Sequence, residues 1–522
     1  MDPLIFRQPT GSLNPLHFVS VNPDFCSPDG HYLYLERQIL KAATEQGWRF
    51  HSLANREVLS RLPEPHSSWL CPVFSNRGVE AHNHSPAERE AFAGELHDWC
   101  VRQLDALSPS DEMLLFIYAG HVFHLPAFWL LLERIRDPRL RVVFNLYAAY
   151  WNFGEHCPHW RLLSEELANV LTAGAAMVDR RRFTLTSDSA TLADMAKAAW
   201  CAEVPLPPFF YMTEPASSAN GASEAMAPRT VTLAYPSSVH RERGFFYFPE
   251  AVKHCQSGWN GGRGKLRFIF RTCVPESSLS PDEARVCKQL MGLGCEIVHD
   301  HLSNEAMVDF YERADVVLNP YPRKAFRDRT SGNFADAMRF GKPVISTHGT
   351  WAGRLVDSLQ VGATFEDGDP VSLGEAMLKV LGNLSQYRAN AVREGAKWTG
   401  ENNVGALLRF VRACSDAPRP QLSETELTLC RQALFRRLQQ HPMTVAGLPG
   451  GSPAVEELKA MTEQKDSEVR SLTNQIRHFR ASPVRALRLW WNRKRNGYRK
   501  GQRPDVRHGN GVASRSENPL NP

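Results

Sequence analysis

The feature that most constrains this chain is a repeated alternation of strand-like and helix-like segments. Short apolar runs occupy residues 17–21, 48–53, 113–119, 141–147 and 183–187. Segments with helical spacing of apolar residues follow them, at residues 32–46, 86–107, 126–135, 162–171 and 191–201. This alternation predicts parallel βαβ units, in which helices cover both faces of a sheet.

The same alternation starts again after an interruption at residues 213–228, which are rich in Ala, Ser, Glu and Pro and predict an exposed linker. We expect strands at 231–235, 266–271, 295–299, 316–319, 343–346 and 363–365. Helices are expected at 281–291, 304–313, 332–340 and 371–381. The predicted fold class is therefore α/β, with two Rossmann-like doubly wound domains facing a cleft and a helical, basic C-terminal extension.

This pattern sets the expected boundaries. An N-terminal domain covers residues 1–212 and a C-terminal domain covers residues 229–415, with the linker 213–228 between them. Strand signals stop near Pro418, so residues 416–480 are expected to form a helical extension. Residues 481–522 are expected to be a basic, partly disordered tail.

Composition limits the class of protein. A chain of 522 residues that is 43% hydrophobic and 22% charged has enough apolar side chains for two or three cores. This excludes wholesale disorder, a collagen-like fibre and a small disulfide scaffold. No apolar run approaches the ~20 residues that span a bilayer. The eleven cysteines are scattered, without a Cys-x-x-Cys pair, so we expect a reducing, cytoplasmic location.

The positive charge is concentrated near the C-terminus. From Arg477 to Arg507 there are eleven basic residues and one acid, so this segment has a net charge of about +10. Because the net charge of the whole chain is +5, the remaining residues together have a net charge of about −5. A near-neutral body argues against a nucleic-acid partner. Arginines beside Leu487, Trp490 and Trp491 favour contact with an anionic membrane surface at the cytoplasmic face. A disordered solubilising tail or a protein contact remains the alternative.

The segment from Val316 to Ser346 carries the chemistry. It is predicted to run strand, loop, helix and strand, and the loop ends in Thr330-Ser331-Gly332. Small residues at a helix start leave backbone N–H groups that can bind phosphate. Asp328 precedes the helix and Asp336 lies within it, eight positions later, where a carboxylate can accept hydrogen bonds from sugar hydroxyls. For Asp336 alone, an exposed helix acid is the alternative.

This segment resembles the group 1 glycosyltransferases (glycosyltransferase family 4), which have the GT-B fold. That family carries Glu-x7-Glu followed by Ala-Met/Leu-Ala-x-Gly-x-Pro-Val-Ile, and here Asp328-x7-Asp336 precedes Ala-Met-Arg-Phe-Gly-Lys-Pro-Val-Ile345. The resemblance implies that Asp336 binds the donor ribose, that Asp328 contacts the donor sugar, and that Thr330, Ser331 and Gly332 lie near the diphosphate. Both glutamates are aspartates here, and Arg-Thr-Ser replaces the family's Gly-Phe-Gly.

A second phosphate signal follows the strand at 231–235. Arg243-Gly244 matches the family's Lys-Gly, while Ser238 stands where the family has Arg, and Arg241 is a possible substitute. An arginine fork pairs well with diphosphate oxygens. A solvated basic turn is the alternative here, and a solvated charge run equally explains Arg323, Lys324 and Arg327.

In the N-terminal half, Gly30 lies at the position of the family's glycine-rich loop and is a candidate donor contact. His121 follows the fourth expected strand and corresponds to a cleft histidine of the family, although a loop histidine is more often plain surface. Tyr147 stands where the family often has a second histidine.

Together these features predict a glycosyltransferase that moves a sugar from a nucleotide-sugar donor to a glycan or lipid-linked acceptor. The resemblance implies retention of configuration, with His121, Asp328 and Arg243 as catalytic candidates. No metal-ligand spacing is present in the sequence, so we expect neither a metal nor a cofactor. The rivals are a catalytically inactive GT-B binding protein, a sugar-nucleotide epimerase of GT-B type and a basic-tail RNA-binding protein.

Overall fold

The computed structural model describes residues 16–27, 31–61, 68–78, 86–121, 124–147, 171, 178–200, 202–209, 230–259, 264–299, 302–417, 423 and 425. Both domains belong to one compact unit, Met1–His441. The predicted linker, the helix at 162–171 apart from residue 171, nearly all of the helical extension, the tail and Gly30 lie outside the described residues.

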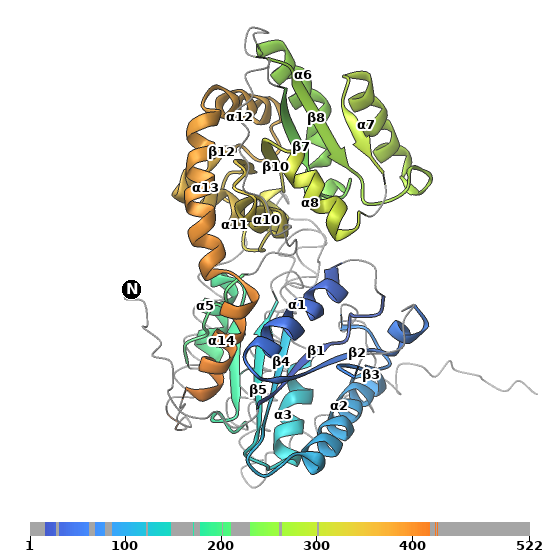
Figure 1. Cartoon of the computed structure of the whole chain (residues 1–522), viewed down its shortest axis with the longest axis vertical. Helices are drawn as coiled ribbons and strands as arrows, with labels where there is room; N and C mark the ends of the chain where they lie inside the picture. Colours follow the sequence, from blue (N-terminus) through green and yellow to red (C-terminus); the bar gives the residue numbers. More distant parts are fainter. Residues whose placement is uncertain are drawn as a thin grey trace, which may run out of the picture. The chain divides into compact units, whose positions relative to one another are not determined.

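The first domain is built on a six-stranded parallel sheet with the order β3-β2-β1-β4-β5-β6 (Figure 1). Its strands are β1 (Leu16–Asn22), β2 (Arg49–Asn55), β3 (Leu70–Phe74), β4 (Glu112–Gly120), β5 (Leu140–Leu146) and β6 (Phe183–Ser187). Its helices are α1 (His31–Glu45), α2 (Pro86–Ala106), α3 (Leu125–Arg134) and α5 (Ala190–Trp200). The sequence predicted all of these except β3, an edge strand that contains Pro72.

The second domain repeats this design, with the strand order β12-β11-β10-β7-β8-β9. All pairings are parallel. Its strands are β7 (Val231–Tyr235), β8 (Leu266–Arg271), β9 (Glu296–Val298), β10 (Val316–Asn319), β11 (Val344–Thr347) and β12 (Gly362–Phe365). Its helices are α6 (Phe248–Gly258), α7 (Pro281–Gly292), α8 (Asn304–Arg313), α9 (Arg323–Phe326), α10 (Gly332–Arg339), α11 (Trp351–Leu359), α12 (Pro370–Gly382) and α13 (Leu384–Glu401). The predicted class of two doubly wound domains is confirmed.

Each sheet is buried on both faces because alternate side chains along its strands enter different cores. On β4, Leu115 joins the core under α2, α3 and α5, whereas Phe116 joins the core under α1. On β10, Leu318 packs towards α6, α7 and α12, whereas Val317 packs towards α8, α10 and α11. This burial of both faces explains why the strands read as continuous apolar runs in the sequence.

A last helix, α14 (Val404–Asp416), follows the second domain in the sequence but belongs to the first domain by its packing. It follows α13 in the sequence but packs on the first domain, where its apolar face joins the core beneath α1. The Arg412 guanidinium donates to Glu112 at 2.5 Å, and Thr184 donates to the Cys414 carbonyl at 2.9 Å. The C-terminal part of the described chain therefore stabilises the first domain directly.

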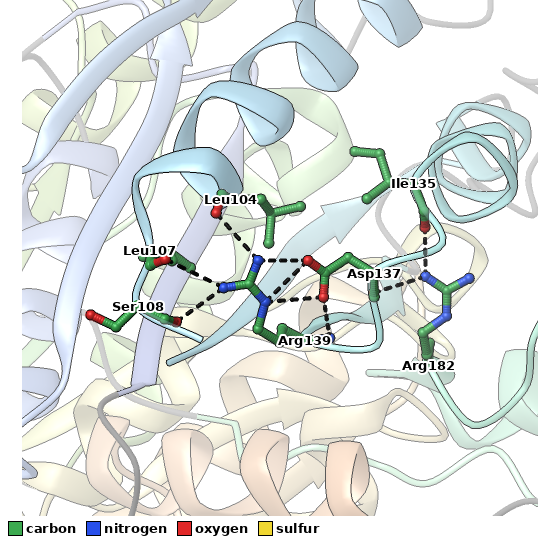
Figure 2. Close-up of polar contacts among 7 residues, drawn as sticks. All are labelled: Leu104, Leu107, Ser108, Ile135, Asp137, Arg139 and Arg182. Carbon is green, nitrogen blue, oxygen red and sulfur yellow. Dashed lines mark hydrogen bonds and ion pairs between the residues drawn. The ribbon is translucent and has the colours of Figure 1, made fainter. Parts of the chain in front are cut away.

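Two arginines bind the C-terminal ends of α2 and α3 in the first domain (Figure 2). Arg139 donates to the Leu104 carbonyl at 3.3 Å and to the Ser108 carbonyl at 3.0 Å. Arg182 donates to the carbonyls of Leu132 at 2.6 Å and Ile135 at 2.7 Å. Helix C-termini expose carbonyls without intrahelical partners, so these guanidiniums satisfy them and complement the helix dipoles.

Adjacent arginines provide a matched test of these contacts. The Arg182 side chain is 11% exposed, whereas the Arg181 side chain is 76% exposed and binds Asp179. Charge-assisted hydrogen bonds contribute about 1.5–3 kcal/mol each, so Arg182→Ala is expected to lower the free energy of unfolding by about 2–4 kcal/mol. Arg181→Ala should leave it almost unchanged, because solvent screens an exposed ion pair. Urea denaturation of both variants checks this, and equal losses would contradict the assigned role of Arg182.

A fully buried carboxyl group lies between α1 and the first sheet. Glu36 accepts hydrogen bonds from Asn22 at 2.9 Å and from Ser20 at 3.0 Å. Burial raises the pKa of Glu36 to about 7, although hydrogen bonds from Asn22, Ser20 and Ser52 oppose the rise. The folded protein therefore holds this proton more tightly than the unfolded chain does.

The raised pKa of Glu36 makes stability depend on pH. Its contribution is complete below the ordinary glutamate pKa of 4.5 and is lost as the pH rises towards about 7. The shift corresponds to about 3 kcal/mol. Glu36→Gln keeps the shape without the ionisation, so this part of the pH dependence should disappear between pH 5 and pH 8. Chemical denaturation across that range measures it, and identical pH profiles for the variant and the wild type would refute the assignment.

Candidate functional site

The candidate site is built where the strand order of the second sheet reverses. The chain runs from β7 outward to β8 and β9, and then returns to place β10 on the other side of β7. Loops that leave the carboxyl ends of β7 and β10 diverge at this point, and open α/β sheets bind ligands there. The two segments that the sequence predicts to contact phosphate, around Arg243 and around Ser331, follow these two strands.

A chain of hydrogen bonds joins the two loops. The Arg243 guanidinium donates to Ser237 Oγ at 2.7 Å, and the Tyr321 hydroxyl donates to the same oxygen at 2.9 Å. Asn333 in the first turn of α10 then donates to the Tyr321 hydroxyl at 2.8 Å. We call Ser237, Arg243, Tyr321 and Asn333 the Ser237 network. It holds the cation at a set position relative to the start of α10.

Gly244 allows the Arg243 loop to approach β10 closely. Its φ is +73°, a left-handed conformation that favours glycine. A Cβ atom placed on Gly244 would lie 1.8 Å from the Pro320 carbonyl oxygen. The Arg243-Gly244 pair of the sequence therefore has a structural reason, since only glycine permits this contact.

The start of α10 has the form that the sequence predicted. Ser331 is the N-cap, and its hydroxyl accepts a hydrogen bond from the Phe334 amide at 3.3 Å. Among the described residues none accepts a hydrogen bond from the amides of Gly332 and Asn333. These amides and the positive end of the helix dipole are thus available to an anion.

The two aspartates of the motif lie in different surroundings. Asp336 is 4% exposed, which excludes the exposed helix acid that the sequence left open. Its carboxylate lies against the Tyr311 phenol. Burial is the main cause that raises the pKa of Tyr311 well above its ordinary value, and the negative charge of Asp336 adds to this rise. Asp328 has a side chain that is 10% exposed, between Arg327 at 3.5 Å and Arg354 at 3.7 Å.

Two hydrogen bonds connect the α10 loop to the first domain. The Thr191 hydroxyl of α5 donates to Asp328 at 2.7 Å. The Thr330 hydroxyl donates to Asp188, which follows β6, at 3.4 Å. The loop that contains the first aspartate of the motif is therefore in contact with the other domain.

The first domain presents polar side chains at the carboxyl ends of its central strands. His121 follows β4 and is 3% exposed, so it is not the plain surface histidine that the sequence left open. Its ring lies 6.2 Å from the ring of His124. Tyr147 follows β5, and burial raises its pKa, while the cations Arg329 and Arg243 of the second domain lower it. Tyr147 therefore lies within electrostatic range of both arginines.

The other residues predicted near the phosphates lie outside the Ser237 network or outside the described residues. Arg241 is exposed and stacks on Phe246, with its guanidinium carbon 4.5 Å from the ring centroid, so it stands apart from the Ser237 network. Ser238 is buried, and its carbonyl accepts the Tyr235 hydroxyl at 2.6 Å. Gly30 lies outside the described residues. No group of three or more His, Cys, Asp or Glu side chains that could hold a metal occurs in the described part of the chain.

Several members of this site were not predicted from the sequence. Tyr321, Asn333, Asp188 and Thr191 were not singled out, although each follows a strand or begins a helix. The available signal was positional, because polar side chains just after adjacent parallel strands meet at one sheet edge.

Comparison with known proteins identifies the domain that carries this site. Residues 230–383 match the model of the family "Glycosyl transferases group 1". These residues form a group 1 glycosyltransferase domain. The match spans β7 to α12 and includes the whole Ser237 network and both aspartates. The prediction of a glycosyltransferase from the motif around Asp328 and Asp336 is therefore confirmed.

Solved structures confirm the two-domain fold. Sucrose-phosphate synthase from Thermosynechococcus elongatus is similar over 77% of this chain and 98% of its own, with 14% identity and a TM-score of 0.53. A glycosyltransferase from Rickettsia africae is similar over 77% and 98%, with 10% identity and a TM-score of 0.52. No curated protein sequence matches. At these identities the likeness shows the GT-B fold alone.

Proposed function

We propose that the protein transfers a sugar from a nucleotide-sugar donor to a glycan or lipid-linked acceptor with retention of configuration. The observation that carries this proposal is the Ser237 network, which places an arginine and the bare amides of α10 together at the β7–β10 reversal.

The roles follow from where charge develops. Breaking the bond between the sugar and the diphosphate leaves negative charge on the departing oxygens. The Arg243 guanidinium and the amides of Gly332 and Asn333 would stabilise that charge, and they need little reorganisation because they are already held in place. Asp336 would accept hydrogen bonds from the ribose, and Asp328 would contact the donor sugar. His121 is the candidate on the acceptor side.

Asp336 and Arg243 provide the test of this function. Asp336→Asn keeps the volume of the buried side chain but weakens its acceptance of ribose hydroxyls. Hydrogen bonds to a charged group contribute about 1.5–3 kcal/mol, so turnover and nucleotide affinity should both fall about 10- to 100-fold. Arg243→Gln should reduce turnover by at least as much. The exposed Asp309 of α8 provides the control Asp309→Asn, which should retain activity.

The measurements are a thermal-shift screen against UDP, GDP, ADP and CMP derivatives, followed by turnover with the sugar nucleotides of the stabilising base. Activity in EDTA is expected because the proposed stabilisation uses protein cations. NMR of the product is expected to show retention. A protein that binds nucleotide but turns over no donor would be the inactive binding protein, and conversion of donor without any acceptor would identify the epimerase.

The basic tail supports a role at the membrane surface, although it lies outside the described residues. Arginines from Arg477 to Arg507 would meet anionic headgroups, and Trp490 and Trp491 would enter the interface, which would bring the enzyme to a lipid-linked acceptor. In the described part of the chain, no helix is long and apolar enough to cross a membrane.

Co-sedimentation with vesicles tests the tail. The full-length chain should bind vesicles that contain phosphatidylserine at low salt, and binding should weaken at 0.5 M salt because ionic screening is stronger. A chain that ends at residue 476 should lose most of this binding, while neutral vesicles should bind neither form. Unchanged binding of the shortened chain would refute the proposal.

A further inference from the structure

We propose that Arg329 binds a negatively charged group, a carboxylate or a phosphate, on the acceptor sugar. This inference rests on the proposed function and names the class of its second substrate. It starts from a residue that the family pattern does not supply, since Arg329 stands where the family has the first glycine of Gly-Phe-Gly.

Arg329 is a half-buried cation that has no acidic partner among the described residues. Its guanidinium carbon lies 4.8 Å from the centroid of the Phe326 ring, which holds the planar group by stacking. No carboxylate or carbonyl of the described residues accepts a hydrogen bond from it. By contrast, its neighbour Arg327 pairs with Asp328, as does Arg354. A guanidinium has five donors in a fork that matches a carboxylate or a phosphate.

The position of Arg329 points to the acceptor. It lies between Asp328 and Thr330, each of which is hydrogen-bonded to the first domain through Thr191 and Asp188. The positive charge of Arg329 also lowers the pKa of Tyr147, which belongs to that domain. Arg329 is therefore held at the contact between the domains, beside the aspartate that would touch the donor sugar.

A second cation, Arg243, also lowers the pKa of Tyr147, but its guanidinium donates a hydrogen bond to Ser237 in the Ser237 network. The carboxylates of Asp188 and Asp24 raise the pKa of Tyr147. These negative charges would repel an anion placed next to them. Asp188 accepts the Thr330 hydroxyl at 3.4 Å. The anionic group is therefore expected beside the Arg329 guanidinium, which stacks on Phe326 and pairs with no carboxylate of the described residues.

The test is calorimetric binding of glucose 6-phosphate, glucuronate and glucose to the full-length chain. The nucleoside diphosphate that stabilises the wild type most is kept saturating, so that Arg243 is occupied. The wild type should bind both anionic sugars at least about tenfold more tightly than glucose. Arg329→Gln should abolish this preference, and Arg329→Lys should keep part of it. The exposed Arg285, paired with Asp282, provides the control Arg285→Gln, which should keep all of it.

Three results would overturn the proposal: no preference for anionic sugars in the wild type, the full preference in Arg329→Gln, or its loss in Arg285→Gln. Comparison of the glucuronate and glucose derivatives of the stabilising nucleotide separates the source of the anion, because a preference confined to these donors would overturn the assignment to the acceptor. Nucleotide stabilisation reports separately on the proposed function. Arg329→Gln should retain it, whereas a wild type that no nucleotide stabilises would refute the function itself.

Discussion

The position of one buried hydroxyl, Ser237 Oγ, determines how the candidate site is assembled. It accepts hydrogen bonds from both Arg243 and Tyr321, which belong to loops that follow different strands. Tyr321 in turn orients the first turn of α10 through Asn333. Although 80 residues of chain separate the end of β7 from the start of β10, the two strands pair side by side, and this parallel pairing creates the meeting point.

The site combines groups that differ in how they are held. Arg243 and the α10 amides are fixed by hydrogen bonds within one domain, whereas Asp328 and Thr330 are held by residues of the other domain. In the proposed function, diphosphate binding would therefore depend on the second domain alone, while the loop assigned to the donor sugar would depend on contact with the first. In the proposed reaction, the loop around the reacting sugar would therefore have the correct geometry only while it is in contact with the first domain.

Much of the fold could be predicted because local periodicity carried it. The limits of β6, β7, β8, β10 and α8 agree with the sequence to the residue. Helix α14 has apolar residues at Val404, Leu407, Leu408 and Val411, which is helical spacing, but its packing on the first domain depends on contacts distant in sequence. The helix-end contacts of Arg139 and Arg182 are equally invisible to a local pattern.

The candidate site divides in the same way. The Asp-x7-Asp spacing and Ser331-Gly332 located the start of α10, because these residues act within one loop. The roles of Ser237, Tyr321 and Thr191 depend on contacts between separate strands and domains. Their spacing in the sequence therefore does not predict these roles. Arg329 was visible as a departure from the family pattern, and only the structure shows that Phe326 holds its guanidinium without a carboxylate.

The most direct measurement is a crystal structure of the full-length chain with a bound nucleoside diphosphate. We predict diphosphate oxygens within about 3 Å of the Arg243 guanidinium and of the Gly332 amide, with the ribose beside Asp336. A nucleotide bound away from the carboxyl ends of β7 and β10, with Arg243 still donating only to Ser237, would contradict this prediction.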